Sequence, residues 1–101
     1  MAIVRGGLPE PELNVPIIDE DGLRHHEPDL SFRKYRIGIE YEGEHHGEEG
    51  QIVRDIARSE RYEALGWTEI RISKRHMLND AKPAVGKIRI ALIQAGWRPG
   101  R

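Results

Sequence analysis

The sequence contains no cysteine, which excludes disulfide bonds, zinc fingers and thiol nucleophiles. Aromatic residues make up only 6% of the chain, and no apolar run is long enough to span a membrane. No basic segment followed by an apolar segment opens the chain, so we expect no signal peptide and a cytoplasmic location. With 38% hydrophobic and 33% charged residues, the 101 residues suit one domain, whether complete or a piece of a longer protein.

Net charge is also scarce, at −1, but it is unevenly distributed. Residues 1–50 hold twelve acidic and five basic residues, a net of −7, whereas residues 51–101 hold five acidic and eleven basic residues, a net of +6. A near-neutral chain is not typical of a purely electrostatic nucleic-acid binder. Two interpretations stay open: carboxylates that hold a metal beside a basic surface that holds phosphate, or two halves that pair with each other.

Hydrophobic alternation and helix-breaking residues predict an α/β (α+β) domain with the element order βββαβα. The run 36–42 alternates for seven residues and is the clearest strand. The predicted strands are residues 13–18, 23–32, 36–42 and 67–72, and the predicted helices are residues 51–65 and a segment from about residue 79 or 80 to Gly96.

Each predicted helix has an apolar side, which we expect to pack against the sheet. These sides consist of Val53, Ile56, Ala57, Ala64 and Leu65 in the first helix and of Val85, Ile88, Ala91 and Leu92 in the second. Trp67 and Trp97 each follow a glycine that ends a helix, and we predict that both lie in the core.

In two neighbouring predicted strands, three acidic residues occupy alternate positions whose side chains point to the same face of the sheet. Glu40 and Glu42 point away from the isoleucines of strand 36–42, and Asp29 has the matching parity in the preceding run. If these runs form a hairpin, the three carboxylates converge and repel one another unless a cation binds or one is protonated. Hard oxygen ligands select Mg²⁺ or a similar cation. The alternative is a solvated acidic face of an antiparallel hairpin.

Histidines and basic residues follow these acids along the chain. His45 and His46 follow the strand after Gly43 and Glu44 and can flank whatever the carboxylates hold, whereas the pair His25 and His26 suggests a surface strand. Three arginines at spacings of four and three on helix 51–65, and one lysine after the last strand, can contact a phosphate backbone. These candidate phosphate contacts are Arg54, Arg58, Arg61 and Lys74. A solvated helix face is the alternative for the arginines.

The order of these motifs resembles the PD-(D/E)XK nuclease superfamily, and in particular small domains similar to very-short-patch-repair endonucleases. The likeness spans about residues 8–97, in the strings GLPEPELN, EPDLSF, IEYEGEHH, RDIARSERYEALGW and RIS. It implies a restriction-endonuclease-like mixed sheet flanked by helices, with DNA as the partner. By this resemblance Asp29 and Glu40 hold Mg²⁺ (or Mn²⁺), Glu42 orients or deprotonates the attacking water, and His46 assists or donates to the phosphate.

Two departures from the superfamily pattern matter. Glu42 stands where most members have a lysine, although Gly43 and His46 fit relatives that have an acid there. Most members also begin with a helix, and the short segment before Pro9 predicts that this helix is missing or truncated. We therefore expect uncovered apolar surface, self-association as a homodimer or completion by an additional N-terminal segment, and poor cleavage by the chain alone.

The sequence thus predicts a magnesium-dependent endodeoxyribonuclease. Two alternatives stay open. One is a catalytically inactive DNA-binding or regulatory module of the same fold, and the other is a metal-independent protein interaction domain.

Overall fold

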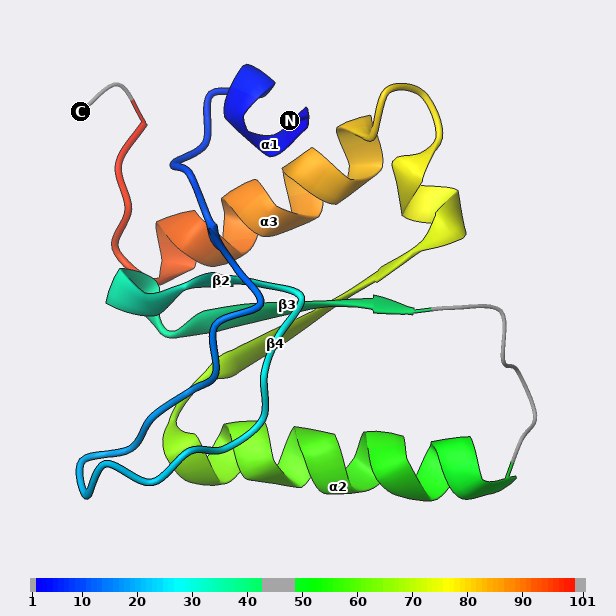
Figure 1. The fold of residues 1–101 in the computed structure, drawn as a ribbon. Coiled ribbons are helices and arrows are strands. Elements are labelled where there is room, and N and C mark those ends of the chain that lie inside the picture. Colours follow the sequence, from blue (N-terminus) through cyan, green and yellow to red (C-terminus); the bar gives the residue numbers. More distant parts are fainter. Residues whose placement is uncertain (1, 43–48, 100–101) are drawn as a thin grey trace.

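The computed structural model describes residues 2–42 and 49–99. Its centre is a four-stranded mixed sheet with the strand order β1-β2-β3-β4, and helices lie on both faces (Figure 1). The elements are α1 (Ala2–Arg5), β1 (Glu12–Leu13), β2 (Leu30–Phe32), the 3₁₀ turn η1 (Arg33–Tyr35), β3 (Ile37–Glu42), α2 (Glu49–Leu65), β4 (Thr68–Ser73), the 3₁₀ turn η2 (Lys74–Met77) and α3 (Lys82–Gln94). The predicted α+β class and the order βββαβα are confirmed, with α1 as one additional turn of helix.

The sheet combines two kinds of strand pairing. β1 pairs with β2 and β2 with β3 in antiparallel fashion, whereas β3 and β4 are parallel. A parallel pair needs a crossover connection, and α2 supplies it. Figure 1 shows α2 on one face of the sheet and α3 on the other.

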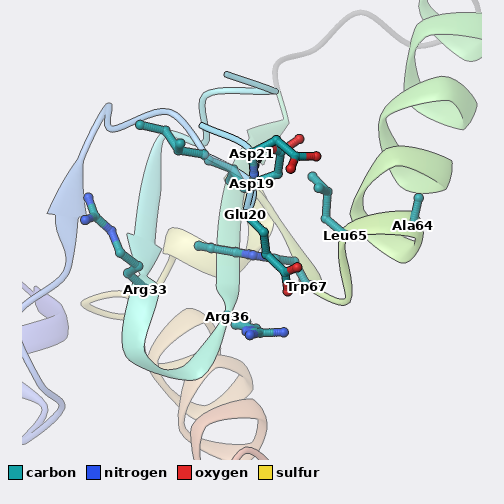
Figure 2. Close-up of a pocket in the computed structure, with 10 residues that line it drawn as sticks. Asp19, Glu20, Asp21, Arg33, Arg36, Ala64, Leu65 and Trp67 are labelled. Atoms are coloured by element: carbon teal, nitrogen blue, oxygen red, sulfur yellow. Dashed lines mark hydrogen bonds between the residues drawn. The ribbon is translucent and has the colours of Figure 1, made fainter. Parts of the chain in front are cut away.

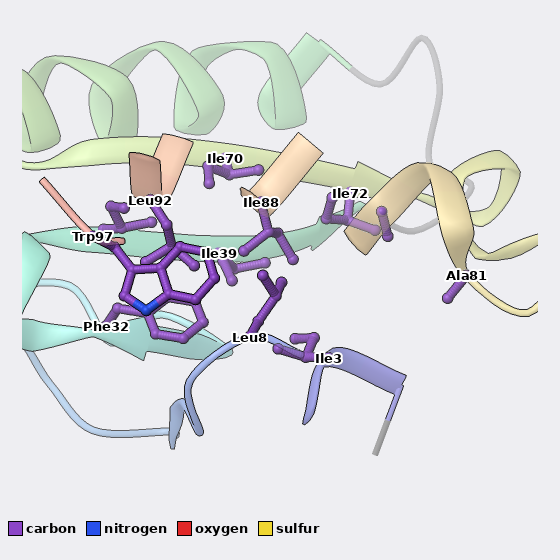
Figure 3. Close-up of a cluster of buried hydrophobic side chains, with 12 residues drawn as sticks. Ile3, Leu8, Phe32, Ile39, Ile70, Ile72, Ala81, Ile88, Leu92 and Trp97 are labelled. Atoms are coloured by element: carbon purple, nitrogen blue, oxygen red, sulfur yellow. The ribbon is translucent and has the colours of Figure 1, made fainter. Parts of the chain in front are cut away.

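The α3 face of the sheet holds the apolar core. Ile37 and Ile39 of β3 are 0% and 3% exposed and belong to one cluster with Ile88 and Leu92 of α3. Figure 3 shows Ile39, Ile88 and Leu92 in this cluster. The core cluster consists of Ile3, Leu8, Phe32, Ile37, Ile39, Ile70, Ile72, Ala81, Ala84, Ile88, Leu92 and Trp97. The predicted burial of the apolar side of the last helix is confirmed, and so is the core position of Trp97. Trp67, in contrast, is only partly buried and lies outside this cluster, so its predicted core position is wrong.

The α2 face is polar. α2 turns its polar side to the sheet, and Ile52, Val53 and Ile56 are 54%, 63% and 55% exposed. The prediction that the apolar side of this helix, including Ala57 and Ala64, packs against the sheet is therefore wrong. The physical reason is that this face of the sheet presents charged side chains, which need polar partners on the helix.

The predicted early strands are shorter in the structure. β1 ends at Leu13 because Asn14 adopts a left-handed conformation with φ 50°, and Ile18 forms only an isolated bridge with Arg24 across the predicted turn. α3 begins later than expected, at Lys82, because residues 79–81 all have positive φ values. None of the helices within residues 2–42 and 49–99 combines the length and apolar character needed to cross a bilayer.

The single turn of α1 covers only part of the sheet beside α3. Ile3 reaches the core, whereas Val4 is 46% exposed. An apolar pocket of about 190 Å³ opens next to Ile3, between the sheet and α3, and the neighbouring Tyr41 and Met77 are 52% and 46% exposed. The expectation of uncovered apolar surface near a short first helix is confirmed.

Candidate functional site

Asp29 lies at the point where the β2–β3 ladder ends. Leu30, which lies opposite Ile39, is the first residue of β2, and Asp29 lies in the bend directly before it, where it lines the apolar pocket beside α3 together with Ile39 and Tyr41. The side chain of Asp29 is held there because its Oδ2 accepts a hydrogen bond of 2.7 Å from the backbone nitrogen of Tyr41. Asp29 itself is exposed, so its carboxylate is accessible from solvent beside the end of β3.

Glu40 lies on the α2 face, opposite to the side chains of Ile37 and Ile39, as strand alternation predicts. It is only 6% exposed. The hydroxyl of Tyr62 in α2 donates a hydrogen bond of 2.5 Å to Oε2 of Glu40, and Nε2 of His26 lies 2.6 Å from the same oxygen. Burial, together with this hydrogen bond and the charge of Glu40, raises the pKa of Tyr62, so the phenol stays protonated and acts as a donor.

Gly38 creates the space through which Tyr62 reaches Glu40. A Cβ atom at position 38 would lie 2.6 Å from Cε1 and 2.8 Å from Cζ of Tyr62, and closer still to its hydroxyl. These separations are far shorter than ordinary van der Waals contacts. The glycine in the string IGIE is therefore required for the ring of Tyr62 to cross β3.

Glu42 belongs to a charged network between α2 and the sheet, which is centred on Arg58. The guanidinium of Arg58 binds Glu42 at 2.9 Å, Glu69 at 2.5 Å and Asp55 at 3.4 Å. The side chain of Arg58 is 16% exposed. Burial lowers the pKa of Arg58, but the hydrogen bond to Glu69 and the charges of Glu69, Glu40 and Glu42 outweigh it, so the pKa is raised and Arg58 is charged.

Ser59 and Arg71 complete the charged network. Arg71 donates to Oγ of Ser59 at 2.8 Å and lies within 3.7 Å of Glu42 and 3.5 Å of Glu69. Oγ of Ser59 donates to Glu69 at 2.7 Å. Burial raises the pKa of Glu69, but the hydrogen bonds from Arg58 and Ser59 and the charges of Arg58 and Arg71 outweigh burial and lower it. Glu69 therefore stays ionised in this partly buried position.

The other sequence-predicted residues are dispersed. Arg54 and Arg61 are exposed on α2, and Nη2 of Arg54 donates to Oε1 of Gln51 at 3.1 Å. Lys74 is exposed in η2, just beyond the end of β4. His45 and His46 lie outside the described residues. The structure thus brings Arg58, but not Arg54 or Arg61, into contact with the predicted acidic residues.

Sequence reasoning missed His26, Tyr62, Glu69 and Arg71. A signal for the last two was present, because alternation in TEIRIS places Glu69 and Arg71 opposite to the isoleucines of β4. The parallel register then sets Arg71 beside Glu40. His26 and Tyr62 have no such signal, since they come from an irregular segment and from the helix.

The donors for a metal ion are carboxylate oxygens. Within residues 2–42 and 49–99, no group of three or more His, Asp or Glu side chains is arranged to hold a metal. Asp29, directly before β2, and Glu40 of β3 offer hard oxygen ligands, and Mg²⁺ is commonly bound by one or two carboxylates together with water and phosphate oxygens. The chemistry of these two donors therefore fits Mg²⁺.

Comparisons with protein-family models, with curated proteins and with solved structures return no match. The resemblance to PD-(D/E)XK nucleases stays a prediction that depends on the sequence motifs.

Proposed function

We propose that this chain is a magnesium-dependent endonuclease with a restriction-endonuclease-like fold, which hydrolyses phosphodiester bonds in DNA. The observation that carries the proposal is the hydrogen bond of 2.7 Å that holds the carboxylate of Asp29 at the backbone amide of Tyr41, the residue directly after Glu40. Glu42 follows two residues later on the same face as Glu40. This arrangement supports the motif assignment made from the sequence.

Asp29 and Glu40 are the residues that would hold the ion. Mg²⁺ or Mn²⁺, when bound, lowers the pKa of a coordinated water and neutralises charge on the scissile phosphate. Tyr62 and His26 orient Glu40 through their contacts with Oε2. Glu42 occupies the position where most members of the superfamily have a lysine, and Arg58 places a positive charge beside it.

The exposed basic residues are the proposed contacts to the DNA backbone. Arg54 and Arg61 on α2 and Lys74 beyond β4 are exposed. Each phosphate contact that is lost should lower the slope of log affinity against log salt by about 0.9 for duplex DNA. Arg58 is assigned to the charged network rather than to phosphate, because three carboxylates already surround it.

A nicking assay on supercoiled plasmid tests the proposal. We expect cleavage with Mg²⁺ or Mn²⁺, none in EDTA, and a loss of at least about 100-fold for Asp29→Asn or Glu40→Gln. Glu60→Gln, on the exposed part of α2, is the matched control and should cleave as the wild type does. Cleavage by Asp29→Asn and Glu40→Gln at the wild-type rate would remove these carboxylates from the reaction.

A catalytically inactive DNA-binding module of the same fold is the second candidate function. It is favoured because two of the carboxylates already have partners within the protein. Glu42 is paired with Arg58, and Glu40 is in contact with Tyr62 and His26. In that case calorimetric titration with Mn²⁺ gives no binding, whereas salt-dependent binding to duplex DNA persists.

A further inference from the structure

A pocket of about 490 Å³ lies at the opposite end of β3 from the carboxylates. It is bordered by the turn that follows Ile18, by the C-terminal end of α2 and by the start of β4 (Figure 2). Its volume falls in the range of pockets that bind small molecules. The residues that matter for its chemistry are Asp19, Glu20, Asp21, Arg33, Arg36 and Trp67.

Trp67 supplies an aromatic wall. Gly66, with φ 73°, ends α2, and the backbone nitrogen of Trp67 then donates to the carbonyl of Tyr62 at 2.9 Å, which fixes the chain before β4 begins. The indole is partly exposed toward the pocket. Figure 2 shows the side chains of Glu20, Arg36 and Trp67 at the same pocket.

Three exposed charged groups of this pocket, Glu20, Asp21 and Arg36, form no ion pair with another described residue. Asp19 is occupied, because it accepts hydrogen bonds from the amides of Asp21 and Leu23 at 2.9 Å and lies 2.7 Å from Nε2 of His25. Arg33 is paired with Glu12 at 2.9 Å. Neither Glu20 nor Arg36 forms an ion pair with another described residue, and both are exposed.

The backbone holds Arg36 in a defined position. Arg36 has φ 55° and ψ 49°, a left-handed conformation that is uncommon outside glycine. Its nitrogen donates to the carbonyl of Arg33 at 3.1 Å, and its carbonyl accepts from the nitrogen of Thr68 at 2.8 Å. The Arg36 side chain therefore starts from a fixed point at the edge of the pocket.

We propose that this pocket binds one unpaired nucleotide of a DNA strand. The base stacks on Trp67, its exocyclic amine donates to Glu20, and its phosphate binds Arg36. The proposal rests on the proposed function and extends it by naming the substrate class, a strand that contains an unpaired cytosine or adenine. Thymine presents a carbonyl where cytosine presents an amine, so Glu20 disfavours thymine.

The position of the pocket suits such a strand. Arg36 directly precedes β3, and the strand from Ile37 to Glu40 spans roughly 10 Å. A single strand that is engaged at the carboxylates therefore reaches the pocket within a few nucleotides.

Fluorescence of Trp67 provides the test. In the Trp97→Phe variant Trp67 is the single tryptophan, and stacking of a base on it should quench its emission. We expect saturable quenching by a short oligo-dC in EDTA, with oligo-dT of equal length binding about fivefold more weakly. Arg36→Gln should weaken both by about tenfold, and Glu20→Gln should abolish the preference for oligo-dC.

Controls separate this proposal from loss of folding and from loss of cleavage. Arg98→Gln and Glu63→Gln are exposed changes outside the pocket and should leave quenching unchanged. Asp29→Asn should also leave quenching unchanged while it removes cleavage, so the two proposals fail separately. If Trp97→Phe does not fold, fluorescence anisotropy of labelled oligo-dC measures binding by the wild-type chain and by Trp67→Ala instead. We expect Trp67→Ala to bind about tenfold more weakly. Absence of saturable binding, or unchanged affinity in Arg36→Gln, would overturn the proposal.

Discussion

The two faces of the sheet are built from alternating residues of the same strands, yet they are held by different forces. On the α3 face, Ile37, Ile39, Ile70 and Ile72 are buried against α3, and apolar contact is the main attraction. On the α2 face, the intervening residues are charged, and α2 is attached through the charged network around Arg58. Burial of apolar surface stabilises folding, whereas a buried ion pair contributes little beyond its own desolvation cost. The α3 face therefore supplies most of the stability, whereas the α2 face holds the charged groups.

Of the substitutions that test this comparison, Leu92→Ala should lower the free energy of unfolding the most. Leu92 is 0% exposed in the core, and truncation of such a leucine costs about 3 kcal/mol in the free energy of unfolding. Ile90→Ala is the matched control on the same helix, because Ile90 is 60% exposed and should lose less than about 0.5 kcal/mol. Urea denaturation measures both. Similar losses at the two positions would mean that α3 does not bury this face.

Gly38→Ala should give the next largest effect, on the α2 face. The new Cβ would collide with the ring of Tyr62, and overpacking of this kind costs about 2 kcal/mol. In a Tyr62→Ala background the collision is absent, so the same change should cost much less. A double-mutant cycle measured by urea denaturation checks the coupling. Simple additivity of the two changes would contradict the close passage of Tyr62 over β3.

Acid should weaken the α2 face through Glu69. The folded-state pKa of Glu69 is lowered, so its stabilising contribution is present above its ordinary pKa of 4.5 and is lost as pH falls through the folded value. When the pH is lowered from neutral to below 4.5, we expect the free energy of unfolding to fall less in Glu69→Gln than in the wild type. Glu63→Gln, an exposed change on α2, should keep the wild-type dependence. Identical urea midpoints against pH for wild type and Glu69→Gln would exclude a stabilising role for the ionised carboxylate.

Ile56→Ser should give the smallest effect. Ile56 is 55% exposed, so its replacement should change the free energy of unfolding by less than about 0.5 kcal/mol. A loss of about 3 kcal/mol would instead show that α2 packs with its apolar side inward.

The sequence was sufficient to predict the main elements of this comparison. β3, α2, β4 and α3 begin and end within three residues of their predicted bounds, because alternation, helical periodicity and terminal glycines are local signals. The placement of Glu40 and Glu42 away from the isoleucines followed from the same alternation and is confirmed.

The predicted orientation of α2 is wrong, because the helical periodicity of residues 51–65 carries no information about the charges on the sheet. Its apolar residues suggested an inward side, whereas the charges of Glu40, Glu42, Glu69 and Arg71 on the sheet select the polar side. The contacts that Glu40 makes with His26 and Tyr62 join residues 14 and 22 positions apart, one of them in an irregular segment. Such contacts depend on tertiary packing and leave no periodic trace in the sequence.

The parallel pairing of β3 with β4 also has a consequence for how the domain folds. Phe32 and Ile37 are only five residues apart in the β2–β3 hairpin, whereas Ile37 and Thr68 are 31 residues apart in the parallel pair. Closing the longer connection is slower, so we expect the hairpin to form early and β4 to dock late. While the chain is being synthesised, one edge of β3 stays unpaired until β4 has emerged. During that interval the nascent domain is most exposed to strand-to-strand association with other chains.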